Sequence, residues 1–201
     1  GARYIAEQVE SILTQSRRVD ELVVSDDASR DGTVDIVREV HARLGDGTAL
    51  VVLENAEPLG VVRNFEQAMR ACTGDVVVLS DQDDRWHPDR VARALDVLAA
   101  PGVLAVHCDA VLVDGEGAPL GPTLLDSLEV PAAVRADLTA GRAFEHLLRR
   151  NLVTGAAFAV TRELIGLAAP FPAVWVHDEW LAIVAASRGG LRLLDEPLVD
   201  Y

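Results

Sequence analysis

The stretch Val76-Val77-Val78-Leu79-Ser80-Asp81-Gln82-Asp83-Asp84 changes abruptly from apolar to acidic residues. Its four consecutive apolar residues are typical of a short strand that is buried on both faces. The stretch Glu21-Leu22-Val23-Val24-Ser25-Asp26-Asp27 repeats the pattern earlier in the chain. Ligands of open parallel sheets bind outside the carboxyl ends of the strands. We therefore expect both acidic clusters at one edge of a shared sheet, facing a common cleft.

Helix and strand patterns alternate around these two stretches. Helical spacing of apolar residues is found at 5–13, 34–44, 63–71 and 88–99, and short apolar runs at 21–24, 50–53, 76–79 and up to Cys108. This alternation predicts an α/β fold with a mostly parallel sheet flanked by helices. In the second half, Asp114-Gly115-Glu116-Gly117 predicts a hairpin turn. The proline-containing stretch 121–139 is expected to be a loop, followed by a helix through Leu147 and a strand through Phe158.

Composition limits the classes of protein to consider. The net charge is −14, so a surface for nucleic acid or for an anionic membrane would repel its ligand. No apolar stretch approaches the ~20 residues of a membrane span, and the first residues do not resemble a signal peptide. We therefore expect a soluble cytoplasmic protein. Cys72 and Cys108 lack the spacing of a metal or disulfide framework and are expected to be buried free thiols.

The second acidic cluster predicts a metal site. Asp81, Asp83 and Asp84 repel one another unless a cation or water compensates their charges. Mg²⁺ commonly binds one or two carboxylates together with substrate phosphates. A metal–diphosphate site therefore suits these residues. Aspartates that follow strands also form turns and cap helices, and Asp26 and Asp27 taken alone fit that interpretation equally well.

These residues resemble family 2 glycosyltransferases, which have the GT-A fold. The run from Leu79 to Trp86 looks like the metal-binding D-x-D motif of that family, and 24–33 matches its D-D-x-S-x-D-G-T segment. Asn151-Leu152-Val153-Thr154-Gly155 and Val176-His177-Asp178-Glu179-Trp180 resemble the region that carries the catalytic base. The resemblance covers nearly the whole chain. Its Asp-Gln-Asp-Asp and His-Asp-x-Trp variants look most like bacterial enzymes that add rhamnose or related sugars to polysaccharides.

The resemblance implies a role for individual residues. Asp178 is then the general base, and Asp83 holds Mg²⁺ or Mn²⁺ on the donor diphosphate. The expected nucleotide-sugar-binding residues are Asp26, Asp27, Asp81 and Arg63. Arg63 and Arg85 are the possible phosphate partners, although most arginines are solvated surface residues. The expected acceptor-side residues are Thr154, Gly155, His177 and Trp180. Asp178 could also simply begin a helix with favourable N-terminal charges. His177 alone would then be an ordinary polar residue at that helix start, and Trp180 a half-buried core contact.

The resemblance also implies an overall function and organisation. We expect one GT-A domain over 1–201, with a nucleotide-sugar-binding half at 1–108 and an acceptor-side half at 109–201. Its reaction would be inverting transfer of a sugar, with rhamnose as the candidate, from a nucleotide diphosphate to a glycan or lipid-linked glycan. Peripheral association with the inner face of the membrane is an accompanying expectation. Relative to the family, a first strand before Gly1 and residues beyond Tyr201 are expected to be missing from this sequence.

Other classes of protein also place aspartates after strands. Aspartate-nucleophile phosphohydrolases have an apolar strand followed by Asp-x-Asp, and receiver-like phosphoacceptor modules carry aspartates after two separate strands. Both need a lysine, and all 18 basic residues here are arginine. The phosphohydrolases also usually have Thr or Val where this chain has Arg85. A catalytically inactive sugar-binding relative is the third alternative, which turnover of a nucleotide sugar would distinguish from an enzyme.

Overall fold

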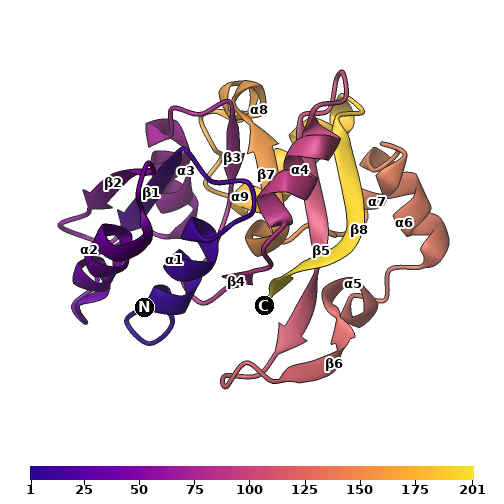
Figure 1. Ribbon diagram of the computed structural model, residues 1–201. Helices are drawn as coiled ribbons and strands as arrows, with labels where there is room; N and C mark the ends of the chain where they lie inside the picture. The colour runs from indigo at the N-terminus through magenta and orange to yellow at the C-terminus, as the bar shows by residue number, and fades with distance from the viewer.

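Two sheets and the helices around them make up the fold in the computed structural model, which describes residues 1–201 (Figure 1). The strands are β1 (Glu21–Asp26), β2 (Ala49–Glu54), β3 (Val76–Val78), β4 (Arg85–Trp86), β5 (Ala105–Val113), β6 (Pro119–Thr123), β7 (Phe158–Thr161) and β8 (Leu191–Asp200). The helices are α1 (Ile5–Leu13), α2 (Thr33–Leu44), α3 (Val61–Ala71), α4 (Arg90–Leu98), α5 (Leu124–Ser127), α6 (Ala132–Thr139), α7 (Phe144–Leu147), the 3₁₀ turn η1 (Gly155–Ala157), α8 (Arg162–Ala168) and α9 (His177–Ser187). The α/β class with flanking helices is confirmed.

The strand directions are mixed rather than mostly parallel. β1 pairs with β2 in a parallel two-stranded sheet. The larger sheet has the order β3-β7-β5-β8-β4, with β6 beside β5, and only its β5–β8 pairing is parallel. The prediction of a mostly parallel sheet is therefore wrong for the larger sheet, whose pairings are mostly antiparallel. Short apolar runs look alike in parallel and antiparallel buried strands, so periodicity does not distinguish the two.

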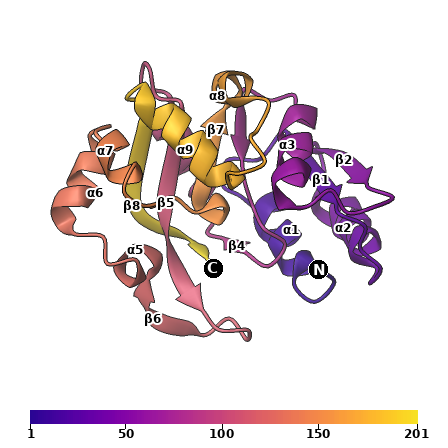
Figure 2. The same ribbon diagram turned by 180° about the vertical axis from the view of Figure 1, so that it is seen from behind.

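The larger sheet is buried because helices cover both of its faces. α4 lies over one face in Figure 1, and α9 crosses the opposite face in Figure 2. The first six residues of β5 are all buried, as expected for a central strand between β7 and β8. The main core cluster lies on the α9 side and includes Met69, Phe158, Leu164 and Leu181. A second cluster joins α1 and α2 to β1 and β8.

A break separates the two sheets. No strand pairing joins β1 to β3, although the Glu21 carboxylate accepts the Thr73 amide at 2.7 Å and so holds the beginnings of the two strands together. A cavity of about 530 Å³ lies between the facing edges of β1 and β3. The segments that follow the two strands also lie close together, because a Cβ on Gly1 would be 3.1 Å from Thr33 and 3.5 Å from Gln82. The carboxyl ends of β1 and β3 therefore lie at the same side of the molecule.

The stretch 121–139, predicted to be a loop, is mostly ordered secondary structure. It completes β6 and then forms α5 and α6. Thr123 and Asp126 form a reciprocal capping box at the beginning of α5, which satisfies backbone amides that would otherwise lack a partner. The prediction was wrong because Pro122 and Pro131 were interpreted as loop markers. Pro131 instead lies directly before the first residue of α6, where its missing N–H has no cost.

Two further expectations can be compared with the structure. Cys72 and Cys108 are free, as predicted, but only Cys108 is buried, whereas Cys72 is half-buried just after α3. None of the helices has both the length and the apolar character required to cross a bilayer.

The burial of His107 predicts that the stability of the folded protein depends on pH. His107 lies on β5, is 1% exposed, and burial lowers its pKa to about 4. The unfolded chain therefore takes up this proton first, so the native state loses stability as the pH falls from about 6.5 towards 4. Between pH 7 and 4.5 this amounts to about 2.5 kcal/mol of unfolding free energy. We expect His107→Leu to remove that part of the pH dependence in urea titrations, and an unchanged pH profile would contradict the assignment.

Candidate active site

The loop after β3 has a shape fixed by hydrogen bonds. The amide of Asp81 donates to the Asp84 carboxylate at 2.7 Å, which closes a tight turn. Two side chains from other elements donate to the Ser80 hydroxyl, namely the Gln8 amide at 2.9 Å and the Trp86 indole at 3.1 Å. We call residues 80–84 the acidic loop. Its backbone is thus held from α1 and β4 as well as from within.

Asp84 is a structural member of the acidic loop. It is 3% exposed, and burial raises its pKa to about 7, with the Asp81 amide acting in the opposite direction. Its carboxylate is turned inward to the backbone of its own loop. Asp81 and Asp83 are therefore the carboxylates of this loop that remain for a ligand.

Acidic and phenolic side chains from distant parts of the chain converge at the acidic loop. Burial raises the pKa of Asp81, and the nearby carboxylates of Asp83 and Asp178 raise it further. The pKa of the Tyr201 phenol is likewise raised, first by burial and then by the carboxylates of Asp81, Asp84, Asp83 and Asp178. The structure thus brings Asp178, predicted from a distant part of the sequence, to the predicted metal-binding residues. Their uncompensated charges make this region attractive to a cation.

The residues present suit a divalent ion that takes few ligands from the protein. No group of three or more His, Cys, Asp and Glu side chains is arranged to hold a metal by itself. Mg²⁺ is usually bound through one or two carboxylates, with substrate phosphates and water completing its coordination. Asp83 and Asp81 match that requirement. Burial raises the pKa of Asp81 most, and a bound cation would offset the further rise that comes from the charges of Asp83 and Asp178.

Asp178 is held by the main chain. It is the second residue of α9 and is 9% exposed. One carboxylate oxygen accepts the amide of Gly155 at 2.9 Å, and the other accepts the amide of Glu179 at 2.7 Å. These two bonds fix the orientation of the carboxylate, and they leave further lone pairs for another donor.

The predicted acceptor-side residues surround Asp178 but differ in what they contact. Gly155 is buried in η1, next to half-buried Thr154, and a Cβ atom at Gly155 would lie 2.9 Å from His177 Nε2. The buried His177 ring stacks on Phe65, with ring centroids 3.9 Å apart, and neither ring nitrogen has a hydrogen-bond partner. Trp180 donates its indole N–H at 2.8 Å to a carbonyl of α8 and packs against the core. It therefore anchors α9.

The first acidic cluster is occupied by backbone amides. Asp26 is buried and accepts the Ser29 amide at 2.9 Å. Asp27 accepts the amides of Leu59 and Gly60 at 2.6 and 3.0 Å, and these bonds, the Leu59 one first, lower its pKa. Asp26 thus makes a local turn, as the alternative interpretation of the sequence described, whereas Asp27 binds the loop that leads into α3. Their nucleotide-binding roles stay predictions.

An amide network extends this cluster towards α3. Asn64 donates to the Ser25 carbonyl at 2.9 Å, and its side-chain oxygen accepts from Ser25 and Asn55. Arg63, the candidate phosphate partner, is exposed in the first turn of α3. Arg85 is engaged elsewhere, because it pairs with Asp200 and Glu7. Of these two arginines, Arg63 alone is left for a ligand.

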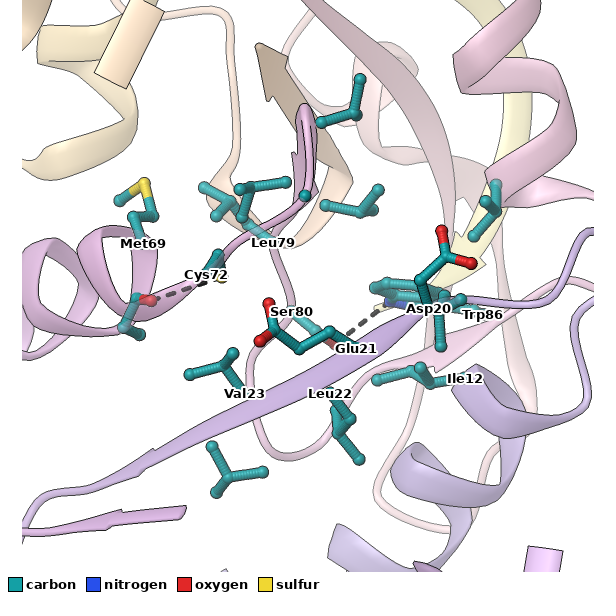
Figure 3. A pocket seen from close by; sticks show the side chains of 18 of the residues that line it. Ile12, Asp20, Glu21, Leu22, Val23, Met69, Cys72, Leu79, Ser80 and Trp86 are labelled. Atoms are coloured by element: carbon teal, nitrogen blue, oxygen red, sulfur yellow. Dashed lines mark hydrogen bonds between the residues drawn. The ribbon is translucent and has the colours of Figure 1, made fainter. Parts of the chain in front are cut away.

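The cavity between β1 and β3 adjoins this region. Figure 3 shows apolar side chains such as Leu22, Val23 and Leu79 along it, with Trp86 donating to Ser80 at one end. Asp81 and Gln82 border the same end. Gly1 lies there too, because a Cβ on it would be 3.1 Å from Thr33 and 3.5 Å from Gln82. The walls of the cavity are mostly apolar, so the cavity suits packed apolar side chains better than a diphosphate. The acidic loop at the end of the cavity is therefore the candidate active site.

Sequence reasoning missed three contributors to the site. Tyr201 approaches the carboxylates from the end of the chain, and a lone tyrosine has no motif that signals this. Asp84 was grouped with the metal-binding residues, and only its burial distinguishes it. Arg90 donates to the backbone carbonyls of Leu79 and Ala156, on two sides of the site. An arginine at the beginning of an amphipathic helix gives no signal of burial.

Comparisons with known proteins identify the family to which the chain is similar. The model of the family "Glycosyl transferase family 2" matches residues 2–158. The chain is 30% identical to a Bacillus subtilis glycosyltransferase named for teichuronic acid biosynthesis, over 58% of this chain and 45% of the relative. It is also 30% identical to a dTDP-rhamnosyl transferase of Shigella flexneri, over 49% of this chain and 35% of the relative. The chain spans less than half the length of these relatives.

The solved structures that resemble the chain are GT-A glycosyltransferases. A mannosyltransferase from Pyrobaculum calidifontis, solved with GDP-Man and Mn²⁺, superposes with a TM-score of 0.73 at 29% identity. The superposition covers 98% of this chain and 52% of the mannosyltransferase. The GT-A fold expected from the sequence is therefore confirmed.

Asp27 generates a prediction about the loop that it binds. Asp27→Asn keeps the shape of the side chain but removes the charge from its bonds to the amides of Leu59 and Gly60. Bonds to charged groups contribute about 1.5–3 kcal/mol, so exchange of these two amides should accelerate about tenfold or more. Hydrogen exchange by NMR measures this effect. Asp114→Asn, which alters a similar turn after β5, should leave both amides unchanged, and equal exchange in the two variants would contradict the assignment.

Proposed function

The chain belongs to glycosyl transferase family 2, and from this premise we propose that it is the catalytic part of an inverting glycosyltransferase. It moves a sugar from a nucleotide diphosphate to an acceptor hydroxyl in the synthesis of a cell-surface polysaccharide. The observation that carries the proposal is the convergence of Asp83 and Asp81 with Asp178, which comes from the other half of the chain. A glycosyltransferase site accounts for these three residues, so neither the phosphohydrolase nor the phosphoacceptor alternative is needed to explain them.

The carboxylates divide into two environments that suit two tasks. The acidic loop offers Asp81 and Asp83 to the donor, and a divalent ion bound there would neutralise charge on the departing diphosphate. Asp178 is oriented by the amides of Gly155 and Glu179 rather than by the acidic loop. It can therefore face the acceptor while the diphosphate occupies the other side.

A single displacement follows from that division. Asp178 takes the proton of the acceptor hydroxyl as the acceptor oxygen forms a bond to the anomeric carbon. The bond from that carbon to the diphosphate oxygen breaks, and its electrons leave with the nucleoside diphosphate. Attack from the face opposite the leaving group inverts the anomeric centre. His177 and Thr154, which adjoin Gly155, are the candidate contacts for the acceptor.

The relatives support a donor and an acceptor class for this proposal. The name of the Shigella relative specifies dTDP-rhamnose chemistry, so rhamnose on a dTDP donor is the first candidate. The teichuronic acid relative supports a polysaccharide acceptor, either a free or a lipid-linked glycan. Lipid-linked acceptors would place the enzyme at the inner face of the membrane as a peripheral protein.

Donor binding should require a divalent ion, because the acidic loop otherwise repels a diphosphate. In a thermal-shift panel of dTDP-, UDP- and GDP-sugars with Mn²⁺ or Mg²⁺, we expect one class to raise the Tm by mass action. Excess chelator should abolish the shift, and so should Asp83→Ala. Asp75→Ala, an exposed aspartate before β3, serves as the matched control and should retain it. If the nucleotide sugar raised the Tm equally in excess chelator, the assignment of Asp83 as a metal ligand would be wrong.

Asp178 should act in the transition state rather than in donor binding. Asp178→Asn keeps the bond from Gly155 and removes the basicity, and general-base catalysis is typically worth ~10²–10⁴ in rate. We therefore expect turnover at least about a hundredfold slower with donor affinity unchanged. Both quantities are measured on one preparation by calorimetry and by release of nucleoside diphosphate. Glu179→Gln is the matched control, and near-parental turnover of Asp178→Asn would transfer the role to Glu179.

A further inference from the structure

Arg90 occupies a position that is unfavourable for a cation. It is the first residue of α4 and is 2% exposed. A helix begins with a partial positive charge, so a guanidinium there is repelled rather than attracted. Burying a charge also carries a large penalty unless hydrogen bonds compensate it. An arginine at this position therefore requires interactions that offset both the repulsion by the helix dipole and the cost of burying its charge.

The guanidinium fills a fork between two strands. β3 and β7 pair in antiparallel register, and the Leu79 amide continues the ladder by donating to the Phe158 carbonyl at 2.9 Å. Beyond this pair the strands separate. Arg90 Nη2 then donates to the Leu79 carbonyl at 3.0 Å and to the Ala156 carbonyl at 2.5 Å. It thus satisfies one buried carbonyl from each side of the fork.

Each side of the fork leads to one half of the candidate active site. Leu79 directly precedes the acidic loop with Asp81 and Asp83. Ala156 lies in η1, beside Gly155, whose amide holds the Asp178 carboxylate. One guanidinium group therefore connects the backbone of the donor-side carboxylates to the backbone that positions the base.

We infer that Arg90 is a positioning residue that sets the separation between the acidic loop and Asp178. This inference rests on the proposed function and adds a residue to it. Arg90 touches neither substrate in this arrangement, so it acts through the two backbone segments. A displacement of about 1 Å between reacting groups can reduce turnover by about a hundredfold.

The chemistry of arginine suits this task. A guanidinium presents several N–H donors in one rigid plane, so a single nitrogen can serve two carbonyls while the ring of Trp86 covers its face at 4.1 Å. Lysine keeps the charge but offers a compact ammonium on a flexible stem. Methionine keeps part of the stem and leaves both carbonyls without a donor.

A double-mutant cycle separates positioning from a general structural role. Asp178→Asn is measured in the parent and in the Arg90→Met background by release of nucleoside diphosphate from dTDP-rhamnose, UDP-GlcNAc and GDP-mannose in the presence of Mn²⁺. We expect Arg90→Met to lower turnover about a hundredfold. The Asp178→Asn substitution should then have less than about a tenfold further effect, because residues that act through one another are not additive. Arg90→Lys should recover part of the loss.

Controls on the same helix make the outcomes decisive. Arg93→Met, which removes a half-exposed ion pair with Glu196, and Val91→Ala, which loosens the buried face of α4, should leave the hundredfold effect of Asp178→Asn intact. The inference alone fails if that effect is equally large with Arg90→Met. If Arg90→Met does not fold, the cycle uses Arg90→Lys, and parental turnover of that variant overturns the inference. If Asp178→Asn does not lower turnover in the parent protein, the proposed function loses its general base, and this outcome is distinct from a failure of the inference about Arg90.

Discussion

Mutual repulsion among carboxylates is the constraint on which the site depends. A chain of net charge −14 gathers several aspartates at the carboxyl ends of its strands, where each must find a partner. Asp26 and Asp27 find backbone amides, and Asp84 is buried against the backbone of its own loop. Asp81 and Asp83 are left without such compensation. The site is thus defined by the carboxylates that the fold does not satisfy.

The sequence located most of the elements that carry these residues, because apolar runs and helical spacing are local properties. The resemblance to a family also predicted that 24–33, 79–86 and the region around Asp178 share one site. The structure brings Asp178 to Asp81 and Asp83, and the role of 24–33 stays a prediction. Strand direction could not be predicted from the sequence. β7 runs antiparallel to β3 and β5, but its apolar residues form the same pattern as those of a buried parallel strand. The helices in 121–139 were missed because prolines mark both loops and helix beginnings.

Individual roles depend on contacts that no local pattern contains. Asp84 and Asp83 are adjacent and chemically identical, yet one is buried against an amide and the other is exposed. Trp180 fits an acceptor-side motif, but its indole is committed to a carbonyl of α8. Arg90 and Arg93 lie one helical turn apart on α4, where one is buried in a strand fork and the other pairs with Glu196 at the surface. Only the tertiary structure separates such pairs.

The proposed base is positioned by main-chain atoms, and this has a consequence for specificity. Asp178 is oriented by the amides of Gly155 and Glu179. Arg90 in turn holds η1 by donating to the Ala156 carbonyl. Side chains that line the acceptor region can therefore change without moving the carboxylate, provided that residue 155 stays small enough to leave room for His177. Such an arrangement keeps the proposed base fixed while the side chains around it vary.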